Sequence, residues 1–160
     1  MINVFTIGVY NSTEEGFFEK LTKNRIDMFC DIRQRRGVRG SLYRYVNSNY
    51  LQAKLRALGI NYTYIKELAP TSEIRQKQKD ADKLNNETKK LRTSLGKVFV
   101  EEYNSQILSH FDIKSLVTNL ENEGAKNVVF FCVEEHANAC HRSLVAKEIS
   151  KLYGIKTIDL

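Results

Sequence analysis

The chain has 160 residues, 42% of them hydrophobic, and a formal net charge of +6 at pH 7. A chain of this length fits one domain and buries enough surface to fold without disulfides. No apolar run approaches the ~20 residues of a membrane-spanning helix, so no membrane partner is expected. The first ten residues lack a signal-peptide pattern, and the three cysteines form no spaced framework. We therefore expect one cytoplasmic domain over residues 1–160 with free thiols.

Strand and helix signals alternate through the first half of the chain. Apolar runs predict strands, leucines at helical spacing predict a helix, and Gly59 is placed to end that helix. Ser12 and Glu15 have the spacing of a capping box, which marks a helix start. In chain order we expect a strand over 4–8, a helix from Ser12 to near Asn24, a strand over 27–33, a loop over 34–46, a helix over 51–58 and a strand over 61–65.

The second half begins with a polar stretch. Residues 72–94 carry few apolar side chains, and we expect an exposed helix or a mobile insertion there. The run NVVFFCV is the most apolar strand in the chain. The remaining expected elements are helices around 99–107, 116–120 and 144–152, the last ended by Gly154, with strands over 127–133 and 156–160.

The alternation of strands and helices predicts an α/β domain. It is typical of a three-layer, Rossmann-like fold, in which helices cover both faces of a mainly parallel sheet of about five strands. Ligands bind such sheets at the carboxyl ends of the strands. The unusual residues of this chain follow the strands that end near Gly8, Arg33 and Glu134. The sequence therefore predicts a site at this edge of the sheet.

The most apolar strand leads to Cys140, His141 and Arg142 at the expected start of a helix. Free N–H groups at a helix start favour an anion and lower the pKa of a nearby thiol. Cys140 is then a candidate nucleophile or redox group, Arg142 an anion ligand and His141 a general acid or base. The plainer interpretation is a buried structural cysteine, which is the commoner role of a single Cys.

Three further residues complete the expected anion pocket. Gly8, Arg33 and Arg36 lie at or after the carboxyl ends of the first two expected strands, where they would meet Arg142. Glu134 closes the most apolar strand and is a candidate catalytic carboxylate that carries a proton or orients an arginine. The alternative for Glu134 is a strand-end charge in solvent, and the sequence does not decide between them.

We expect no metal and no cofactor. Cys132, His136, Cys140 and His141 supply thiols and imidazoles, but their spacing is not the C-x2-C pattern of zinc sites. Cys132 also falls inside an apolar strand. The chain lacks the glycine-rich dinucleotide fingerprint and the P-loop, which argues against standard use of NAD or ATP.

A second candidate surface is the loop from Arg33 to Arg44, which contains five arginines and no acid. Clustered arginines attract phosphates, and tyrosines between them stack on bases. The residues that would bind nucleic acid are Arg35, Arg36, Arg39, Arg44, Tyr43 and Tyr45.

Motifs along the whole chain resemble those of one known family. They are T-I-G, D-I-R, G-I-x-Y, C-x-E and C-H-R, at Thr6–Gly8, Asp31–Arg33, Gly59–Tyr62, Cys132–Glu134 and Cys140–Arg142. In this order they are similar to the motifs of domain-of-unknown-function family 488, which comprises small bacterial, archaeal and viral proteins. The resemblance implies a Rossmann-type three-layer fold and no settled activity.

The chain departs from the family pattern at two places. Val9-Tyr10 stand where the family has His-Ser, so any role of that histidine is absent or supplied elsewhere. Leu68-Ala69-Pro70 stand where the family has L-G-G, which changes the expected rim of the pocket.

Three functions are left open, and with them the question whether the chain is an enzyme. The first is a thiolate enzyme that uses Cys140 to hydrolyse a phosphate or acyl ester or to transfer sulfur. The second is a nucleic-acid-binding or processing module that uses the arginine loop. The third is a module that binds a small anion or nucleotide without catalysis. The expected partners are a small anionic ligand, phosphate-like or carboxylate, with a nucleic acid or a second copy of the chain as alternatives.

Overall fold

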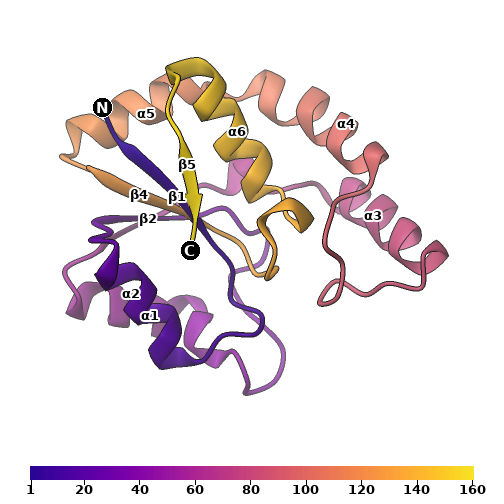
Figure 1. Cartoon of the computed structure of the whole chain (residues 1–160), viewed down its shortest axis with the longest axis horizontal. Helices are drawn as coiled ribbons and strands as arrows, with labels where there is room; N and C mark the ends of the chain where they lie inside the picture. Colours follow the sequence, from indigo (N-terminus) through magenta and orange to yellow (C-terminus); the bar gives the residue numbers. More distant parts are fainter.

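The computed structural model describes all 160 residues and contains one five-stranded sheet (Figure 1). All strand pairs are parallel, in the order β3-β2-β4-β1-β5. This arrangement confirms the predicted Rossmann-like α/β fold. The strands are β1 (Asn3–Ile7), β2 (Met28–Asp31), β3 (Asn61–Tyr64), β4 (Asn127–Phe131) and β5 (Thr157–Asp159).

Helices cover both faces of the sheet, as predicted. α1 and α2 lie on one face, and α3 to α6 lie on the other (Figure 1). No helix has the length and apolarity to cross a membrane. The helices are α1 (Glu14–Lys23), α2 (Ser48–Ala57), α3 (Ser72–Leu84), α4 (Lys97–Gln106), α5 (Ile113–Asn122) and α6 (Arg142–Tyr153).

The central strand β4 contributes to both hydrophobic cores. Val128 and Phe130 pack in the core under α3 to α6, whereas Val129 and Phe131 pack in the core under α1 and α2. Neighbouring side chains of a strand point to opposite faces, so a strand buried on both faces needs an unbroken apolar run. All four side chains are fully buried, which stabilises the fold by roughly 1.5–3 kcal/mol for each.

The helix ends agree with the glycine signals but not with the predicted capping box. Gly59 and Gly154 follow α2 and α6 with φ of 71° and 65°, a left-handed conformation that glycine adopts at little cost. The N-cap of α1 is Thr13, whose hydroxyl accepts from the Gly16 amide at 3.1 Å, so the prediction from Ser12 was wrong by one residue. Ser12 instead donates to the Val9 carbonyl.

The polar stretch 72–94 contains α3 and a segment that returns toward the sheet. α3 buries Ile74, Gln78 and Asp82, which lie four residues apart on one face. Gln78 accepts from the Gly96 amide at 2.8 Å and donates to Asp82 at 2.7 Å. Residues 72–84 of the stretch are helical and residues 85–94 are not, and the side chains that the stretch buries are mostly polar.

The chain after β1 approaches the chain after β4 very closely at Gly8. A Cβ atom at this position would lie 1.9 Å from the Glu134 carbonyl oxygen, which is far inside van der Waals contact. Gly8 is therefore required by packing at the edge of the sheet where the predicted site lies.

Replacing Gly8 by alanine forces these two backbone segments apart. We expect Gly8→Ala to lower the free energy of unfolding by about 3 kcal/mol, measured by urea denaturation. Gly37→Ala is the matched control, because a Cβ there meets only Asn47 Oδ1 at 3.6 Å, an ordinary contact. Equal stability of the two variants would contradict the close approach at Gly8.

Candidate functional site

A cleft of about 630 Å³ lies at the carboxyl ends of the central strands. Its size is within the range of small-molecule sites. Eight of its lining side chains are basic and three are acidic, so the cleft favours an anion. The basic residues are Arg33, Arg35, Arg39, Arg75, Lys79, Lys89, Lys90 and Arg92, and the acidic ones are Asp82, Glu87 and Glu134.

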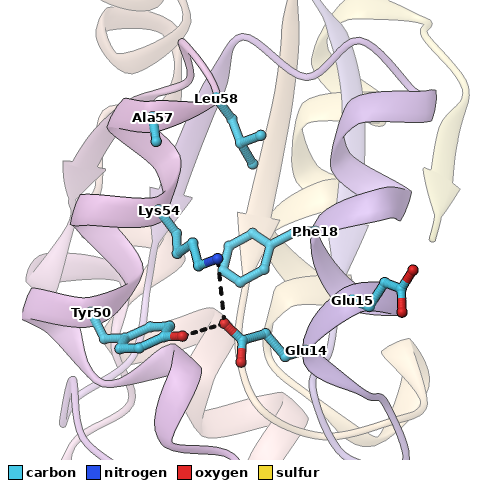
Figure 2. A pocket seen from close by; sticks show the side chains of 7 residues that line it. All are labelled: Glu14, Glu15, Phe18, Tyr50, Lys54, Ala57 and Leu58. Atoms are coloured by element: carbon cyan, nitrogen blue, oxygen red, sulfur yellow. Dashed lines mark hydrogen bonds and ion pairs between the residues drawn. The ribbon is translucent and has the colours of Figure 1, made fainter.

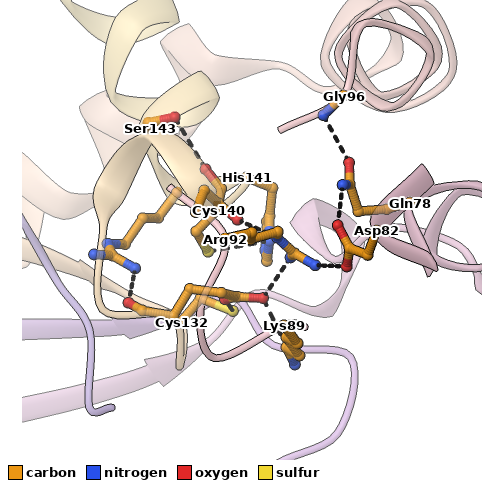
Figure 3. Close-up of polar contacts among 12 residues, drawn as sticks. Gln78, Asp82, Lys89, Arg92, Gly96, Cys132, Cys140, His141 and Ser143 are labelled. Atoms are coloured by element: carbon orange, nitrogen blue, oxygen red, sulfur yellow. Dashed lines mark hydrogen bonds and ion pairs between the residues drawn. The ribbon is translucent and has the colours of Figure 1, made fainter. Parts of the chain in front are cut away.

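Two sulfurs and an imidazole meet at the floor of this cleft (Figure 3). The donor atoms of Cys132, Cys140 and His141 all lie within 4.8 Å of one another, and all three residues are buried. Cys132 follows β4, while Cys140 and His141 immediately precede α6. Cys132 and His141 line the cleft, and Cys140 lies behind them. We refer to these three residues as the sulfur–imidazole cluster.

The ring of His141 is oriented by the backbone after β2. Its Nε2 lies 2.8 Å from the Ile32 carbonyl oxygen, which can only accept, so Nε2 carries a proton. Nδ1 then faces the sulfurs, 3.7 Å from Cys140 Sγ. Tyr103 of α4 packs against the other side of the ring, with 5.5 Å between ring centroids.

The two clustered thiols differ in acidity. A hydrogen bond from Cys140 holds the pKa of Cys132 well below its usual range, with help from His141 and Lys89 and against the effect of burial. Burial and the neighbouring Cys132 sulfur raise the pKa of Cys140. Cys132 is therefore the more acidic of the two thiols, whereas we predicted the acidic thiol at Cys140. Burial lowers the pKa of His141, but the charges of Cys132 and Glu134 outweigh it, and the net shift is upward.

Glu134 is buried beside the cluster and is not a strand-end charge in solvent. Its Oε2 accepts from Cys132 Sγ at 3.3 Å, and its Oε1 pairs with Arg92 at 3.0 Å and with Lys89 at 3.6 Å. Arg92 also binds Asp82 at 2.9 Å and the Ala139 carbonyl at 3.1 Å. Neither Arg92 nor Lys89 was a predicted site residue, because both lie in the stretch that we expected to be exposed.

Arg33 lies on the wall of the cleft with one nitrogen free. It donates to Asp31 through Nε at 2.9 Å and Nη2 at 2.7 Å, and its guanidinium stacks on the Phe131 ring at 4.7 Å. Its Nη1 is buried and has no hydrogen-bond partner. Tyr62 also donates to Asp31, at 2.9 Å, so the carboxylate that orients Arg33 is itself fixed.

The other predicted anion ligands do not reach the cleft. Arg142 is fully buried and donates to the Glu134 and Glu135 carbonyl oxygens at 2.5 and 3.0 Å, which closes the loop before α6. Gly8 packs against the same Glu134 carbonyl. Arg36 stacks on the Tyr64 ring at 4.3 Å and lies outside the cleft.

The arginine loop is divided between the cleft, the core and the surface. Arg35, Arg39 and Tyr43 line the cleft, whereas Arg44 is exposed outside it. Tyr45 is 3% exposed and packs in the core, which leaves it no free face for a base.

Tyr10, which stands at the family's serine position, also lines the cleft. Its ring lies 5.4 Å from that of Tyr43, and the Lys90 ammonium lies 5.6 and 6.0 Å from the two rings. Val9, at the family's histidine position, is buried in the core. Pro70, one of the residues that replace L-G-G, lies on the lining of the cleft.

A second hollow lies between α1 and α2 (Figure 2). Its only buried ring is Phe18, and it contains no thiol or imidazole. Glu14 in this hollow accepts from Tyr50 and pairs with Lys54 at 3.7 Å. Its central carboxylate is already paired, and without a thiol, an imidazole or an arginine in its lining this hollow is a weaker candidate than the basic cleft.

Comparison with known proteins gives one match. A family model described as "Domain of unknown function DUF488" matches residues 13–149, which include the arginine loop and the sulfur–imidazole cluster. No curated protein and no solved structure matches the chain. An argument for function therefore has to rest on the cleft itself.

The buried ion pairs of Arg92 give a testable result. We expect Arg92→Met to lower the free energy of unfolding by about 3–5 kcal/mol, because the buried Asp82 then loses its arginine partner and Glu134 keeps only the more distant Lys89. Urea denaturation measures this change. Arg35→Met removes an exposed arginine from the same cleft and should change stability by no more than about 0.5 kcal/mol. A loss of the same size in both variants would mean that the Arg92 pairs do not stabilise the fold.

Proposed function

The chain belongs to the DUF488 family, as its motifs predicted, and we propose that it is an enzyme that binds a small phosphate-bearing ligand in the basic cleft. The observation that carries this proposal is the coincidence of two features in one cavity. Basic side chains surround the opening, and the sulfur–imidazole cluster lies at the floor. Strongly polarised groups at the bottom of a concave, charged pocket are typical of active sites.

Arg33 is the group best suited to the phosphate. Its guanidinium is fixed by Asp31 before any ligand arrives, so binding loses little side-chain entropy. Its unpartnered Nη1 needs an acceptor, and a phosphate oxygen supplies one through a charge-assisted hydrogen bond. The exposed Arg35, Arg39 and Lys79 add positive charge around the opening.

Tyr10 and Tyr43 favour a ligand that also carries a flat ring. The two rings and the Lys90 ammonium lie together on the lining of the cleft. Stacking of a base on an aromatic side chain contributes roughly 1–3 kcal/mol. A nucleotide combines a planar ring with a phosphate, so mononucleotides are the first ligand class to test.

The floor of the cleft supports hydrolysis or group transfer. Cys132, His141 and Glu134 supply a sulfur, an imidazole and a carboxylate at one place, and each of them lines the cleft. Such groups activate a nucleophile and move protons. In this proposal Cys140 supports Cys132 through the hydrogen bond between the two sulfurs, and Arg142 holds the loop between Cys132 and Cys140 in place.

The proposal predicts that nucleotide binding depends on the charge of the cleft. We expect wild-type protein to bind nucleoside monophosphates in a calorimetric titration, and the double variant Lys79→Gln/Lys90→Gln to bind about tenfold more weakly, a loss of about 1.4 kcal/mol. Lys20→Gln/Lys147→Gln removes the same charge from exposed positions outside the cleft and should bind like wild type. Equal affinities of the two double variants, or no binding by wild type, would contradict the proposal.

Nucleic-acid binding is the second candidate, because Arg44 extends the positive surface beyond the cleft. If a nucleic-acid strand is the true ligand, a single-stranded oligonucleotide will bind more tightly than the mononucleotide, and its affinity will fall steeply with salt. Arg44→Gln should then weaken the oligonucleotide complex and leave mononucleotide binding unchanged. If a single nucleotide is the whole ligand, the oligonucleotide will bind no more tightly than the mononucleotide, and Arg44→Gln will change the affinity of neither complex.

A further inference from the structure

We propose that Cys132, Cys140 and His141 bind one zinc ion at the floor of the cleft. This inference deepens the proposed function, because the ion would lie where the phosphate-bearing ligand meets the reactive groups. The zinc site differs from our expectation of no metal, which rested on the spacing of Cys and His in the sequence. The three donor atoms come together only in the folded chain.

The donor set and its dimensions suit zinc. Thiolate sulfur and imidazole nitrogen are the ligands that Zn²⁺ prefers in proteins. Bonds of about 2.3 Å to sulfur and about 2.0 Å to nitrogen in a tetrahedron separate neighbouring ligand atoms by roughly 3.6–3.8 Å. Cys140 Sγ and His141 Nδ1 are 3.7 Å apart, and no pair in the cluster exceeds 4.8 Å. Small rotations of the side chains would therefore bring all three atoms to bonding distance of one ion.

The orientation of His141 is an independent observation for a metal. A histidine that binds a metal through one ring nitrogen donates the other N–H to a carbonyl or carboxylate, which fixes the ring and its tautomer. Here Nε2 donates to the Ile32 carbonyl, so the lone pair of Nδ1 points to the side where both sulfurs lie. The Nδ1 lone pair now lies within hydrogen-bond distance of the Cys140 thiol, and a metal ion would replace the thiol proton there.

The charges around the cluster also balance with an ion present. Two thiolates and one Zn²⁺ sum to zero formal charge, and the adjacent Glu134 is already compensated by Arg92 and Lys89. Metal binding deprotonates a ligating thiol. The carboxylate oxygen that now accepts from Cys132 at 3.3 Å would then be free for another donor.

Three protein ligands leave the fourth position of a tetrahedral ion open. Structural zinc sites are closed by four protein ligands, whereas catalytic sites keep one position for water or substrate, as in the Cys2His site of alcohol dehydrogenase. Cys132 and His141 both line the cleft, so the open position would face the ligand. A water molecule bound there becomes acidic near neutral pH, and Glu134 lies next to Cys132 to accept its hydrogen bond.

Metal content and optical spectra test the site in the full chain. We expect purified, reduced protein to retain one zinc ion per chain by elemental analysis. After removal with a chelator, Co²⁺ should give the visible bands of a tetrahedral site and a sulfur-to-cobalt charge-transfer band. Bound Zn²⁺ should also protect Cys132 and Cys140 from alkylation.

Variants locate the site within the chain. Cys132→Ser and Cys140→Ser should weaken Zn²⁺ binding by more than about 100-fold, the upper end of what loss of an outer-shell partner costs. Cys30→Ala is the matched control, because Cys30 is buried in the core away from the cluster, and it should bind the ion like wild type. Circular dichroism checks that each variant is folded. If a variant does not fold, the Co²⁺ spectrum of the wild-type protein still shows whether sulfur ligands bind the metal.

Three results would overturn the zinc site. They are a Co²⁺ spectrum without the charge-transfer band, equal loss of metal in Cys30→Ala and in the cluster variants, and a reduced protein that takes up no metal but forms a Cys132–Cys140 disulfide on oxidation. Nucleotide titration of the same samples separates the two proposals. Nucleotide binding without metal uptake would support the anion-binding cleft and contradict the zinc site. Metal uptake without nucleotide binding would support the zinc site and contradict nucleotide binding in the cleft.

Discussion

The ion pair between Arg92 and Glu134 connects two parts of the chain that are otherwise far apart in sequence. Glu134 follows the central strand, and Arg92 lies in the polar segment between α3 and α4. A buried carboxylate without a partner would be very costly, so the segment after α3 has to lie over the end of β4. This placement makes Lys89 and Lys90 part of the cleft lining. The buried pair therefore helps to hold the positively charged segment over the floor of the cleft, together with the bonds from Arg92 to the Ala139 carbonyl and from the Leu95 amide to the Asn138 carbonyl.

The fold was predictable from the sequence because its signals are local and redundant. The apolar run of β4 requires burial on both sides, and Gly59 and Gly154 end their helices in a conformation that other residues avoid. The polar stretch 72–94 was less predictable. α3 has the helical four-residue repeat of a buried face, but Gln78 and Asp82 occupy two of its three inward positions. Methods that depend on apolar periodicity do not recognise a face that is buried through hydrogen bonds.

The position of the cleft was easier to predict than the contacts of the residues around it. Strand ends and the C-H-R motif indicated the edge of the sheet at which the cleft lies. Cys132 was placed inside an apolar strand, and it is buried in the core, but it also lines the cleft. Arg142 was taken for a ligand, but its two terminal nitrogens donate to the backbone carbonyls of Glu134 and Glu135 and it does not line the cleft. The signal that could have identified the cluster is C-x-E followed by C-H across a short loop, since a strand end and a helix start converge there.

The carbonyl of Ile32 and the guanidinium of Arg33 belong to consecutive residues at the end of β2. The first orients His141 in the cluster, and the second belongs to a residue that lines the cleft and has one buried nitrogen without a partner. Because this backbone continues a central strand, the separation between Arg33 and the cluster is fixed by the sheet. In the proposed function, a ligand bound by Arg33 at one end and by the cluster at the other is selected by its length, so a homologue longer by one methylene should bind more weakly.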